Sequence, residues 1–445
     1  MMLDWLDRLR NRALARSGGT LPASQYQDAG NGLKYLLIAG LVLLILLSGF
    51  LFDSPGKIGA GLLRIVTSPS TLLSDYMAIG GPGAAIVNCG LMMALCLIVS
   101  RICRADMNGP TLTTVMVSGG YALFGKNPFN ALPIILGVYL YARFRRERFS
   151  SHVLSAFFGL SAGPMVSYMA FGLGWPPATA LPLAFLTGLV IGFVLPALAA
   201  HFLSFHQGYT LYNMGFVSGV VGLALMALLR AFGLGNDAAV SFPLTGFEAP
   251  LLIWVLSVIA LTGFCGWLLS PDLKGALMAL MREPGRLSSD YVSRYGIGPV
   301  LFNMALSGLI STGYVFLSGG RLTGPTIGAI LSVMGFCGFG KHPRNIWPIL
   351  LGAQIMARLG IWQASSDTII MAALYGTNLA PIPGSFGWPA GILAGFLHVA
   401  ASVNLAYLHG YTNLYNNGFS GGFVAAVFAT LILAFRQRGA SRKKG

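Results

Sequence analysis

The chain is 445 residues long, 55% of them hydrophobic and only 9% charged, and its mean hydropathy is +0.72. A water-soluble protein normally carries about 25% charged residues, so this composition excludes an ordinary soluble domain and predicts a membrane protein. The net charge of +15 does not indicate nucleic-acid binding, because the basic residues cluster at expected helix ends instead of forming one basic face.

The N-terminal residues 1–17 are predicted to form an amphipathic helix at the membrane interface, since Trp5 and several leucines stand among arginines. The segment lacks the apolar core of a cleavable signal peptide. Residues 18–31 are expected to be a flexible polar linker. Residues 1–32 therefore form a cytoplasmic N-terminal unit.

Ten apolar runs are long enough to cross a bilayer, which takes roughly 20 residues. The five cysteines fall in or beside these runs without metal-ligand spacing, so we interpret them as reduced core residues and expect neither a metal nor a cofactor. The predicted crossings are residues 33–52, 83–101, 151–172, 180–200, 208–231, 249–269, 299–317, 366–384, 388–407 and 413–435.

The chain contains the same sequence words twice, mostly 215 residues apart. A duplicated, very apolar chain is typical of a transporter or channel built from two repeats. Downstream the spacing shifts, but Gly174-Trp175-Pro176 still returns as Gly387-Trp388-Pro389. The pairs at a spacing of 215 include Asp75 and Asp290, Asn88 and Asn303, Gly109 and Gly324, Lys126 and Lys341, and Arg143 and Arg358.

Positive charge marks the cytoplasmic side of a membrane protein. The N-terminus and the tail at residues 436–445 are both basic, so both are expected inside. Five crossings in each half, an odd number, then predict inverted halves. Residues 33–232 would be membrane repeat 1, residues 233–248 an external connection, and residues 249–435 membrane repeat 2. The predicted fold is an all-α integral membrane protein with two inverted repeats of about five transmembrane helices, each holding a re-entrant broken helix pair.

The segment at residues 109–145 carries the most interesting chemistry. Its apolar stretches, 110–124 and 129–142, are each short for a full crossing, and Gly125–Asn130 lies between them. We interpret this break and its copy as re-entrant hairpins inside the membrane, where the returning helix would offer unpaired N–H groups and a positive dipole end to an anion. The alternative is two short helices joined by a surface loop with solvated lysines. The predicted pathway residues are Lys126, Asn127, Asn130, Lys341, His342 and Asn345.

Two further sets of polar residues recur at expected helix starts. Tyr212 and Asn213, like Tyr415 and Asn416, open the last helix of each half and either bind a polar solute or cap the helix. The second set consists of Asp75 and Asp290, which precede the second helix of each half. A carboxylate at membrane depth suggests ion or proton coupling, whereas at a helix start it is more often a cap.

Two apparent enzyme motifs do not predict catalysis. The glycine and lysine spacing of a phosphate loop occurs at Gly120–Lys126 and Gly335–Lys341, but each follows an apolar helix and lacks the next Ser or Thr. Gly159–Gly163 matches a nucleophile-elbow pattern, yet its repeat partner has Asn378 in place of Ser161. We therefore expect that the protein is not an enzyme.

Two stretches resemble the urea-channel family. Phe124–Pro128 resembles the Asn-Pro element that opens its pore half-helix, and Leu211–Gly219 resembles a word at the start of a later helix. This resemblance implies inverted halves of five crossings plus a pore half-helix, although the Leu-Pro-x-x-Thr-x-Pro-Phe signature of that family is absent. Over its length the chain more closely resembles an uncharacterised family of prokaryotic multi-pass membrane proteins, which implies a bacterial or archaeal plasma membrane.

The sequence thus favours a channel or facilitator for a small polar or anionic solute at the interface of two inverted repeats. The alternative is a proton- or sodium-coupled secondary transporter that uses Asp75 and Asp290, and a membrane-embedded enzyme is a distant third class. The expected partners are the lipid bilayer and the solute, without nucleic acid, and assembly into a homo-oligomer is left open.

Overall fold

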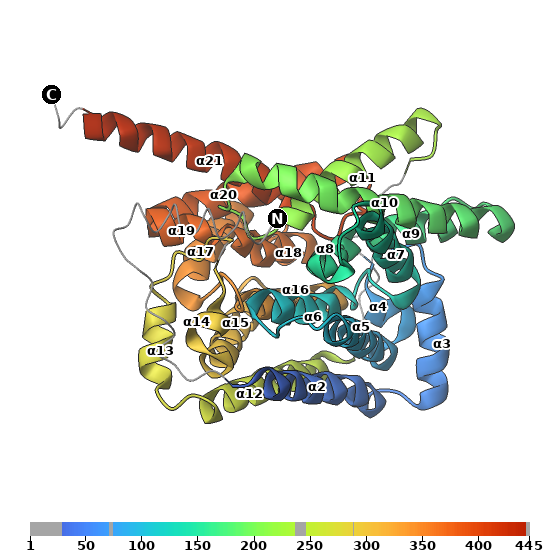
Figure 1. The fold of residues 1–445 in the computed structure, drawn as a ribbon, viewed down its shortest axis with the longest axis horizontal. Helices are drawn as coiled ribbons and strands as arrows, with labels where there is room; N and C mark the ends of the chain where they lie inside the picture. The colour runs from blue at the N-terminus through green and yellow to red at the C-terminus, as the bar shows by residue number, and fades with distance from the viewer. Residues whose placement is uncertain (1–28, 71–73, 236–245, 288, 442–445) are drawn as a thin grey trace.

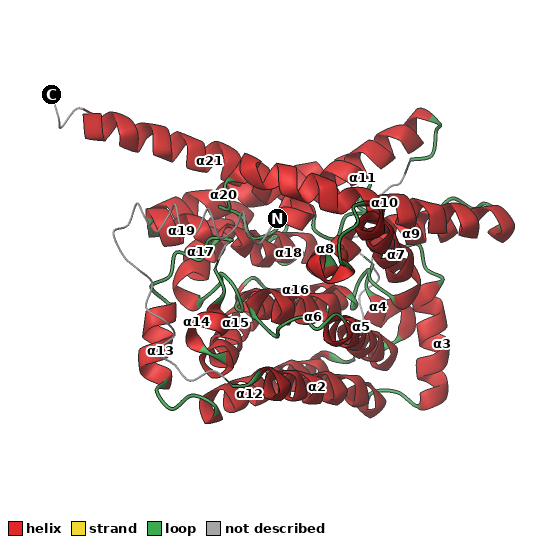
Figure 2. Cartoon of the chain, in the orientation of Figure 1, coloured by secondary structure: helices red, strands yellow, loops and turns green. Residues whose placement is uncertain are grey.

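The computed structural model describes residues 29–70, 74–235, 246–287 and 289–441. In these ranges all regular structure is helical (Figures 1 and 2). The predicted N-terminal amphipathic helix lies outside the described residues, as does most of the predicted external connection. The helices fall into two sets of ten with the same order, α2–α11 and α12–α21, which we call the first and second halves.

The first half contains four short helices among longer ones. Proline stands in the first turn of α3, α5 and α7, where its missing N–H breaks no helical hydrogen bond. Its helices are α2 (Asn31–Ser48), α3 (Pro55–Val66), α4 (Tyr76–Gly80), α5 (Pro82–Ile102), α6 (Gly109–Tyr121), α7 (Pro128–Phe144), α8 (Val153–Gly159), α9 (Gly163–Phe171), α10 (Pro177–His206) and α11 (Asn213–Ala231).

The second half repeats this order helix by helix. Its last helix continues through Ser441, so the first part of the predicted basic tail extends α21. The helices are α12 (Glu248–Leu268), α13 (Leu273–Leu280), α14 (Tyr291–Tyr295), α15 (Ile297–Leu317), α16 (Gly324–Phe336), α17 (Pro343–Leu359), α18 (Asp367–Gly376), α19 (Pro381–Phe386), α20 (Trp388–Leu405) and α21 (Asn416–Ser441).

Nine helical segments of the described chain are long and apolar enough to cross a membrane, and they coincide with nine of the ten predicted crossings. The tenth, residues 366–384, consists of α18, a 3₁₀ turn at Thr377–Leu379 and α19, the same division that its counterpart shows as α8, Leu160–Ala162 and α9. Pro381 and Pro383 explain the division, because proline cannot donate the backbone hydrogen bond that would continue the helix.

The surface of the described chain is apolar and its interior holds many polar groups. Large side chains such as Leu36, Ile98 and Ile253 are more than half exposed, whereas Asn88 and Asn303 are fully buried. A soluble protein shows the opposite distribution. The apolar helices and this surface together identify a multi-pass membrane protein.

The two halves meet along α6 and α16. In Figure 1 these helices lie at the centre, with α5 and α15 beside them and α2 and α12 along the lower edge. Thr113 at the start of α6 donates to the carbonyl oxygen of Gly335 at the end of α16, at 2.6 Å. A Cβ on Gly120 would lie 2.6 Å from the carbonyl oxygen of Gly328, and one on Gly328 would lie 2.4 Å from that of Gly120. Only glycine permits this close antiparallel contact.

Each half also caps the central helix of the other. The Asp75 carboxylate accepts from the backbone N–H of Gly324 at the start of α16, at 3.1 Å. The Asp290 carboxylate accepts from the N–H of Gly109 at the start of α6, at 2.9 Å. The amphipathic helices α3 and α13 lie at opposite ends of the molecule, right and left in Figure 1.

Candidate functional site

The α6–α7 and α16–α17 connections are two breaks with the same local geometry. The Lys126 N–H donates to the carbonyl of Tyr121 at 3.0 Å, and the Lys341 N–H donates to that of Phe336 at 3.1 Å. Each bond joins residues five positions apart, one more than in an ordinary α-helical bond, and ends the preceding helix. The predicted interruption of helix at both positions is therefore confirmed.

An asparagine from the neighbouring helix holds each break. Asn88 on α5 donates to the carbonyl oxygens of Ala122 and Lys126 at 2.7 and 2.8 Å. Asn303 on α15 makes the equivalent bonds to Cys337 and Lys341 at 3.3 and 2.9 Å. Buried carbonyls that leave a helix need such donors. The sequence shows this pair only as a repeat at a spacing of 215 residues, which was the available signal for its role.

The first turn of the returning helix is capped by the chain itself. The Asn127 side chain accepts from the N–H of Asn130 at 3.0 Å, and the Asn130 side chain accepts from the N–H of Asn127 at 3.1 Å. In the second half the Asn345 side chain accepts from the N–H of His342 at 2.9 Å. The prediction that these N–H groups are unpaired is wrong at the capped positions, because the side chains after each lysine already satisfy them.

The same residues make further bonds within the fold. Asn130 and Asn345 each donate to the carbonyl of the break glycine five residues earlier, at 2.9 and 2.8 Å. Asn127 donates to the Tyr76 hydroxyl at 3.2 Å, and His342 contacts the carbonyl of Glu283 at 3.0 Å through Nε2. These four predicted pathway residues thus shape the breaks.

The two lysines meet tyrosines from both halves at the centre of the protein. Tyr121 and Tyr375 stack with ring centroids 5.2 Å apart, and Tyr415 meets Tyr121 edge to face at 4.6 Å. Tyr212 and Tyr415 are 5.6 Å apart. We call this set the tyrosine–lysine cluster; it consists of Tyr121, Lys126, Tyr212, Lys341, Tyr375 and Tyr415.

The two lysines of the cluster have different contacts. Lys341 Nζ donates to the Tyr212 hydroxyl at 2.8 Å and lies 5.1 Å from the Phe336 ring centroid. Lys126 Nζ lies 5.1 and 5.6 Å from the ring centroids of Tyr121 and Tyr415, without a hydrogen-bond partner among the described residues. Both lysines are 0% exposed. Each therefore sits on aromatic faces contributed by both halves.

The Tyr-Asn words lie at the start of the last helix of each half, as predicted. In each word the tyrosine and the asparagine make different contacts. The tyrosines join the cluster, whereas the asparagines bind the preceding helix. Asn213 contacts His206 at 3.0 Å and donates to the carbonyl of Ala199 at 3.0 Å. Asn416 donates to the carbonyl of Ser402 at 3.0 Å.

Asp75 and Asp290 cap the short helices that follow them. The Asp75 side chain accepts from the N–H of Met77 at 2.8 Å, and that of Asp290 accepts from the N–H of Ser293 at 3.0 Å. The interpretation of both as helix caps is confirmed. Asp75 lies between two candidate spans and is 2% exposed, with Oδ2 unpartnered among the described residues. Burial raises its pKa to about 6, against the opposing effect of the bonds from Met77 and Gly324.

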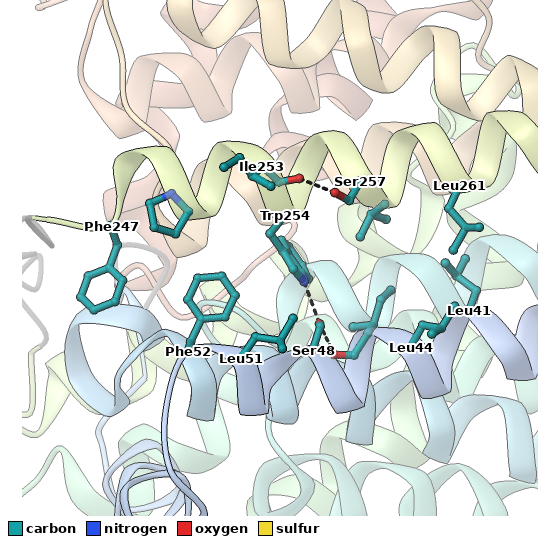
Figure 3. Close-up of a pocket in the computed structure, with 13 residues that line it drawn as sticks. Leu41, Leu44, Ser48, Leu51, Phe52, Phe247, Ile253, Trp254, Ser257 and Leu261 are labelled. Carbon is teal, nitrogen blue, oxygen red and sulfur yellow. Dashed lines mark hydrogen bonds between the residues drawn. The ribbon is translucent and has the colours of Figure 1, made fainter.

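A groove of about 560 Å³ lies between α2 and α12 at the periphery (Figure 3). Its lining is almost wholly apolar, and Trp254 donates to the Ser48 hydroxyl across it at 2.7 Å. Leu51 and Ile253 on its rim are 83% and 66% exposed. An apolar lining cannot replace the hydration of a polar solute, so this groove is not the candidate pathway.

The described residues contain no group of three or more potential metal ligands. In the nucleophile-elbow pattern, the Ser161 hydroxyl bonds the Ser218 hydroxyl at 2.8 Å, not a base. The tyrosine–lysine cluster, which brings both break lysines together with tyrosines of both halves, is the candidate site.

The chain belongs to the family described as "Protein of unknown function (DUF1576)", which matches residues 54–231 and 271–434. No curated protein and no solved structure matches the chain. The predicted membership of an uncharacterised family is confirmed, whereas the resemblance to urea channels and the prokaryotic origin stay predictions. Both matched stretches begin just before the amphipathic helix, α3 or α13, of their half.

Proposed function

We propose that the protein moves a small anionic or carbonyl-bearing solute across the plasma membrane, through the interface of two inverted repeats, as a gated channel or facilitator. One observation carries the proposal. Lys126 and Lys341 are fully buried at this interface, on backbone that has left the helix, and neither has an ion-pair partner among the described residues.

Burying a charge costs several kcal/mol unless it is paired and hydrogen-bonded. A chain that keeps two such groups fully buried needs a compensating role for them. The surrounding phenol hydroxyls are neutral donors, so the cluster suits an anion or a carbonyl oxygen. A cation would meet two ammonium groups and is disfavoured.

The arrangement of the halves supports inversion. The central helices α6 and α16 are antiparallel, and the aspartate caps of Asp75 and Asp290 are exchanged reciprocally. If the long helices cross the membrane along the horizontal of Figure 1, then α3 and α13 lie at opposite membrane faces, where amphipathic helices belong. In this arrangement the basic tail favours a cytoplasmic location for both termini.

The length of the central helices supports re-entrant breaks. Each has 13 residues and so spans about 20 Å, which is less than the hydrocarbon thickness of about 30 Å. Each ends at a buried lysine inside the protein, where irregular backbone is tolerated at membrane depth.

The cluster is closed in this conformation. Tyr121 and Tyr375 are 0% exposed, and so are both lysines. A permanently open pore would leave its lining in contact with water. Movement of solute therefore requires the halves to separate locally, for which the cluster at their interface is the expected gate.

A coupled secondary transporter is the second candidate, favoured by Asp75. This carboxylate is buried, has one unpartnered oxygen and links α4 to α16 of the other half. Asp367 is the acidic group that faces it. Protonation of Asp75 would weaken its bonds to two helix N-termini and so change the contact between the halves.

The test is flux into proteoliposomes, using formate, acetate, chloride, nitrate and urea. We expect the wild type to pass at least one of them above protein-free liposomes, and the Lys126→Met/Lys341→Met variant to lose that flux. Lys57→Met on the exposed face of α3 is the matched control and should keep it. Wild-type flux through the double variant would move the site away from the lysines, and flux that needs a proton or sodium gradient would favour the coupled transporter.

A further inference from the structure

The aromatic surroundings of the two lysines differ at equivalent positions. Tyr121 stands where the second half has Phe336, 215 residues later. Tyr375 in the second half corresponds to Phe158 in the first half. The Tyr375 ring stacks on Tyr121, with ring centroids 5.2 Å apart. The Phe158 ring stacks on Phe336 in the equivalent way, with centroids 5.9 Å apart. The Lys126 side therefore has two ring hydroxyls that the Lys341 side lacks.

The two lysines also differ in hydrogen bonding, because only Lys341 has a hydrogen-bond partner for Nζ among the described residues. Lys341 Nζ is already bonded to the Tyr212 hydroxyl. Tyr415, the counterpart of Tyr212, offers Lys126 its ring, and its hydroxyl has no partner among the described residues. Lys126 Nζ and the Tyr415 hydroxyl are thus two buried polar groups with unused hydrogen-bonding capacity in one cluster.

We propose that the tyrosine–lysine cluster holds one oxyanion subsite, at Lys126, and that the Lys341–Tyr212 pair is its closed counterpart. The two oxygens of a carboxylate would take a charge-assisted bond from Lys126 Nζ and neutral bonds from the hydroxyls of Tyr121 and Tyr415, which have no partner among the described residues. The inference rests on the proposed function in that both place an anion at this cluster. It goes further because it names the ligand class and assigns it to one half.

The donor set specifies the ligand class. An ammonium with phenol hydroxyls can satisfy a compact group that only accepts hydrogen bonds, such as a carboxylate. Stacked rings of Tyr121 and Tyr375 supply flat apolar walls. Formate and acetate are therefore the smallest suitable probes, and urea, which carries donors as well as a carbonyl, is the contrasting one.

The experiment is thermal unfolding of the purified wild type in detergent at increasing potassium formate, potassium acetate or urea. A ligand that binds only the folded state raises the midpoint in a saturable way. We expect saturation with formate or acetate and none with urea. Lys126→Met should weaken apparent affinity at least tenfold, since a hydrogen bond to a charged group is worth about 1.5–3 kcal/mol.

The matched variants test the one-sided assignment. Lys341→Met should weaken the affinity clearly less than Lys126→Met does, because Lys341 stays bonded to Tyr212 and attracts the anion only through its charge. Tyr121→Phe should weaken it about fivefold to tenfold, as expected for one lost hydrogen bond, whereas Phe336→Tyr at the equivalent position should not strengthen it. Because Tyr121→Phe removes only a hydroxyl, it keeps the test valid if Lys126→Met does not fold.

Three results would overturn the inference: equal loss in Lys126→Met and Lys341→Met, no effect of Tyr121→Phe, or no saturable stabilisation by either carboxylate. Its failure can be told apart from that of the proposed function. One-sided binding without flux would retain the subsite and reject transport, whereas flux without one-sided binding would reject the subsite and retain transport.

Discussion

Replacing each central lysine with methionine should change stability in different ways. Lys126 Nζ is buried without a hydrogen-bond partner among the described residues, and an unsatisfied buried polar group costs about 1–3 kcal/mol, more when charged. Methionine has a similar length without a charge, so Lys126→Met should increase the free energy of unfolding by about 1–3 kcal/mol. The stabilised variant should at the same time lose transport, because a functional site is often locally destabilising.

Lys341→Met also removes a buried amino group, but it breaks the 2.8 Å bond to Tyr212. The Tyr212 hydroxyl is then buried and unpaired, at a cost of about 1–3 kcal/mol, which offsets the gain. Each lysine faces two rings at similar distances, so the cation–π contributions largely cancel in the comparison. Lys126→Met should therefore be more stable than Lys341→Met by about 1–3 kcal/mol.

The assay is reversible unfolding in mixed micelles of mild detergent and dodecyl sulfate, followed by tryptophan fluorescence. Tyr212→Phe supplies the control, since in that background Lys341→Met no longer strands a hydroxyl and should be as favourable as Lys126→Met. Equal stability of the two single variants, or a destabilised Lys126→Met, would refute the assignment of Lys126 as the unsatisfied group.

Three further predictions concern the contact between the halves, the break and the buried carboxylate. Gly328→Ala should destabilise the protein by about 1–3 kcal/mol in the same assay, because its Cβ would meet a backbone carbonyl, whereas Gly313→Ala, with nothing within 4 Å, should not. Asn88→Leu should cost about 2–5 kcal/mol, since it leaves two buried break carbonyls without a donor, and faster proteolysis at the α6–α7 connection should report it. Because burial raises the pKa of Asp75 to about 6, above its unfolded value of about 4, this carboxyl should contribute a downward slope of roughly 2 kcal/mol to the stability of the wild type as pH rises from 4 to 7. Asp75→Asn should lack this slope and Asp290→Asn should retain it; the same slope in all three proteins would contradict the reasoning.

The sequence predicted the features that depend on local pattern and on duplication. Apolar runs gave nine crossings, and the repeated Gly-Lys-x-Pro words located both breaks. Asn127 followed by Pro128 is a helix start that needs no tertiary information. The tyrosine words could be placed for the same reason, because Tyr212 and Tyr415 stand directly before long apolar helices.

The parts that the sequence did not predict are contacts between distant segments. Tyr375 was overlooked because its counterpart, Phe158, carries no polar group, so comparison of the repeats gave no reason to select it. The bond of Asp75 to Gly324 joins residues 249 positions apart. One sequence contains no record of such pairings. The expectation of free N–H groups after the lysines failed for a similar reason, since it ignored the competing side chains of Asn130 and Asn345.

Duplication alone would place two equal binding positions close together, since the Tyr212 and Tyr415 rings that carry the two lysines are only 5.6 Å apart. Two strong anion sites would retain the solute, and conduction requires binding that is favourable enough for uptake and weak enough for release. Lys341 already donates a hydrogen bond to Tyr212, so it gains less than Lys126 from binding a ligand. Around Lys341, phenylalanines also stand where tyrosines surround Lys126. Under the proposed function, the difference between the halves leaves one strong position, at Lys126, beside a weaker one from which the solute can depart.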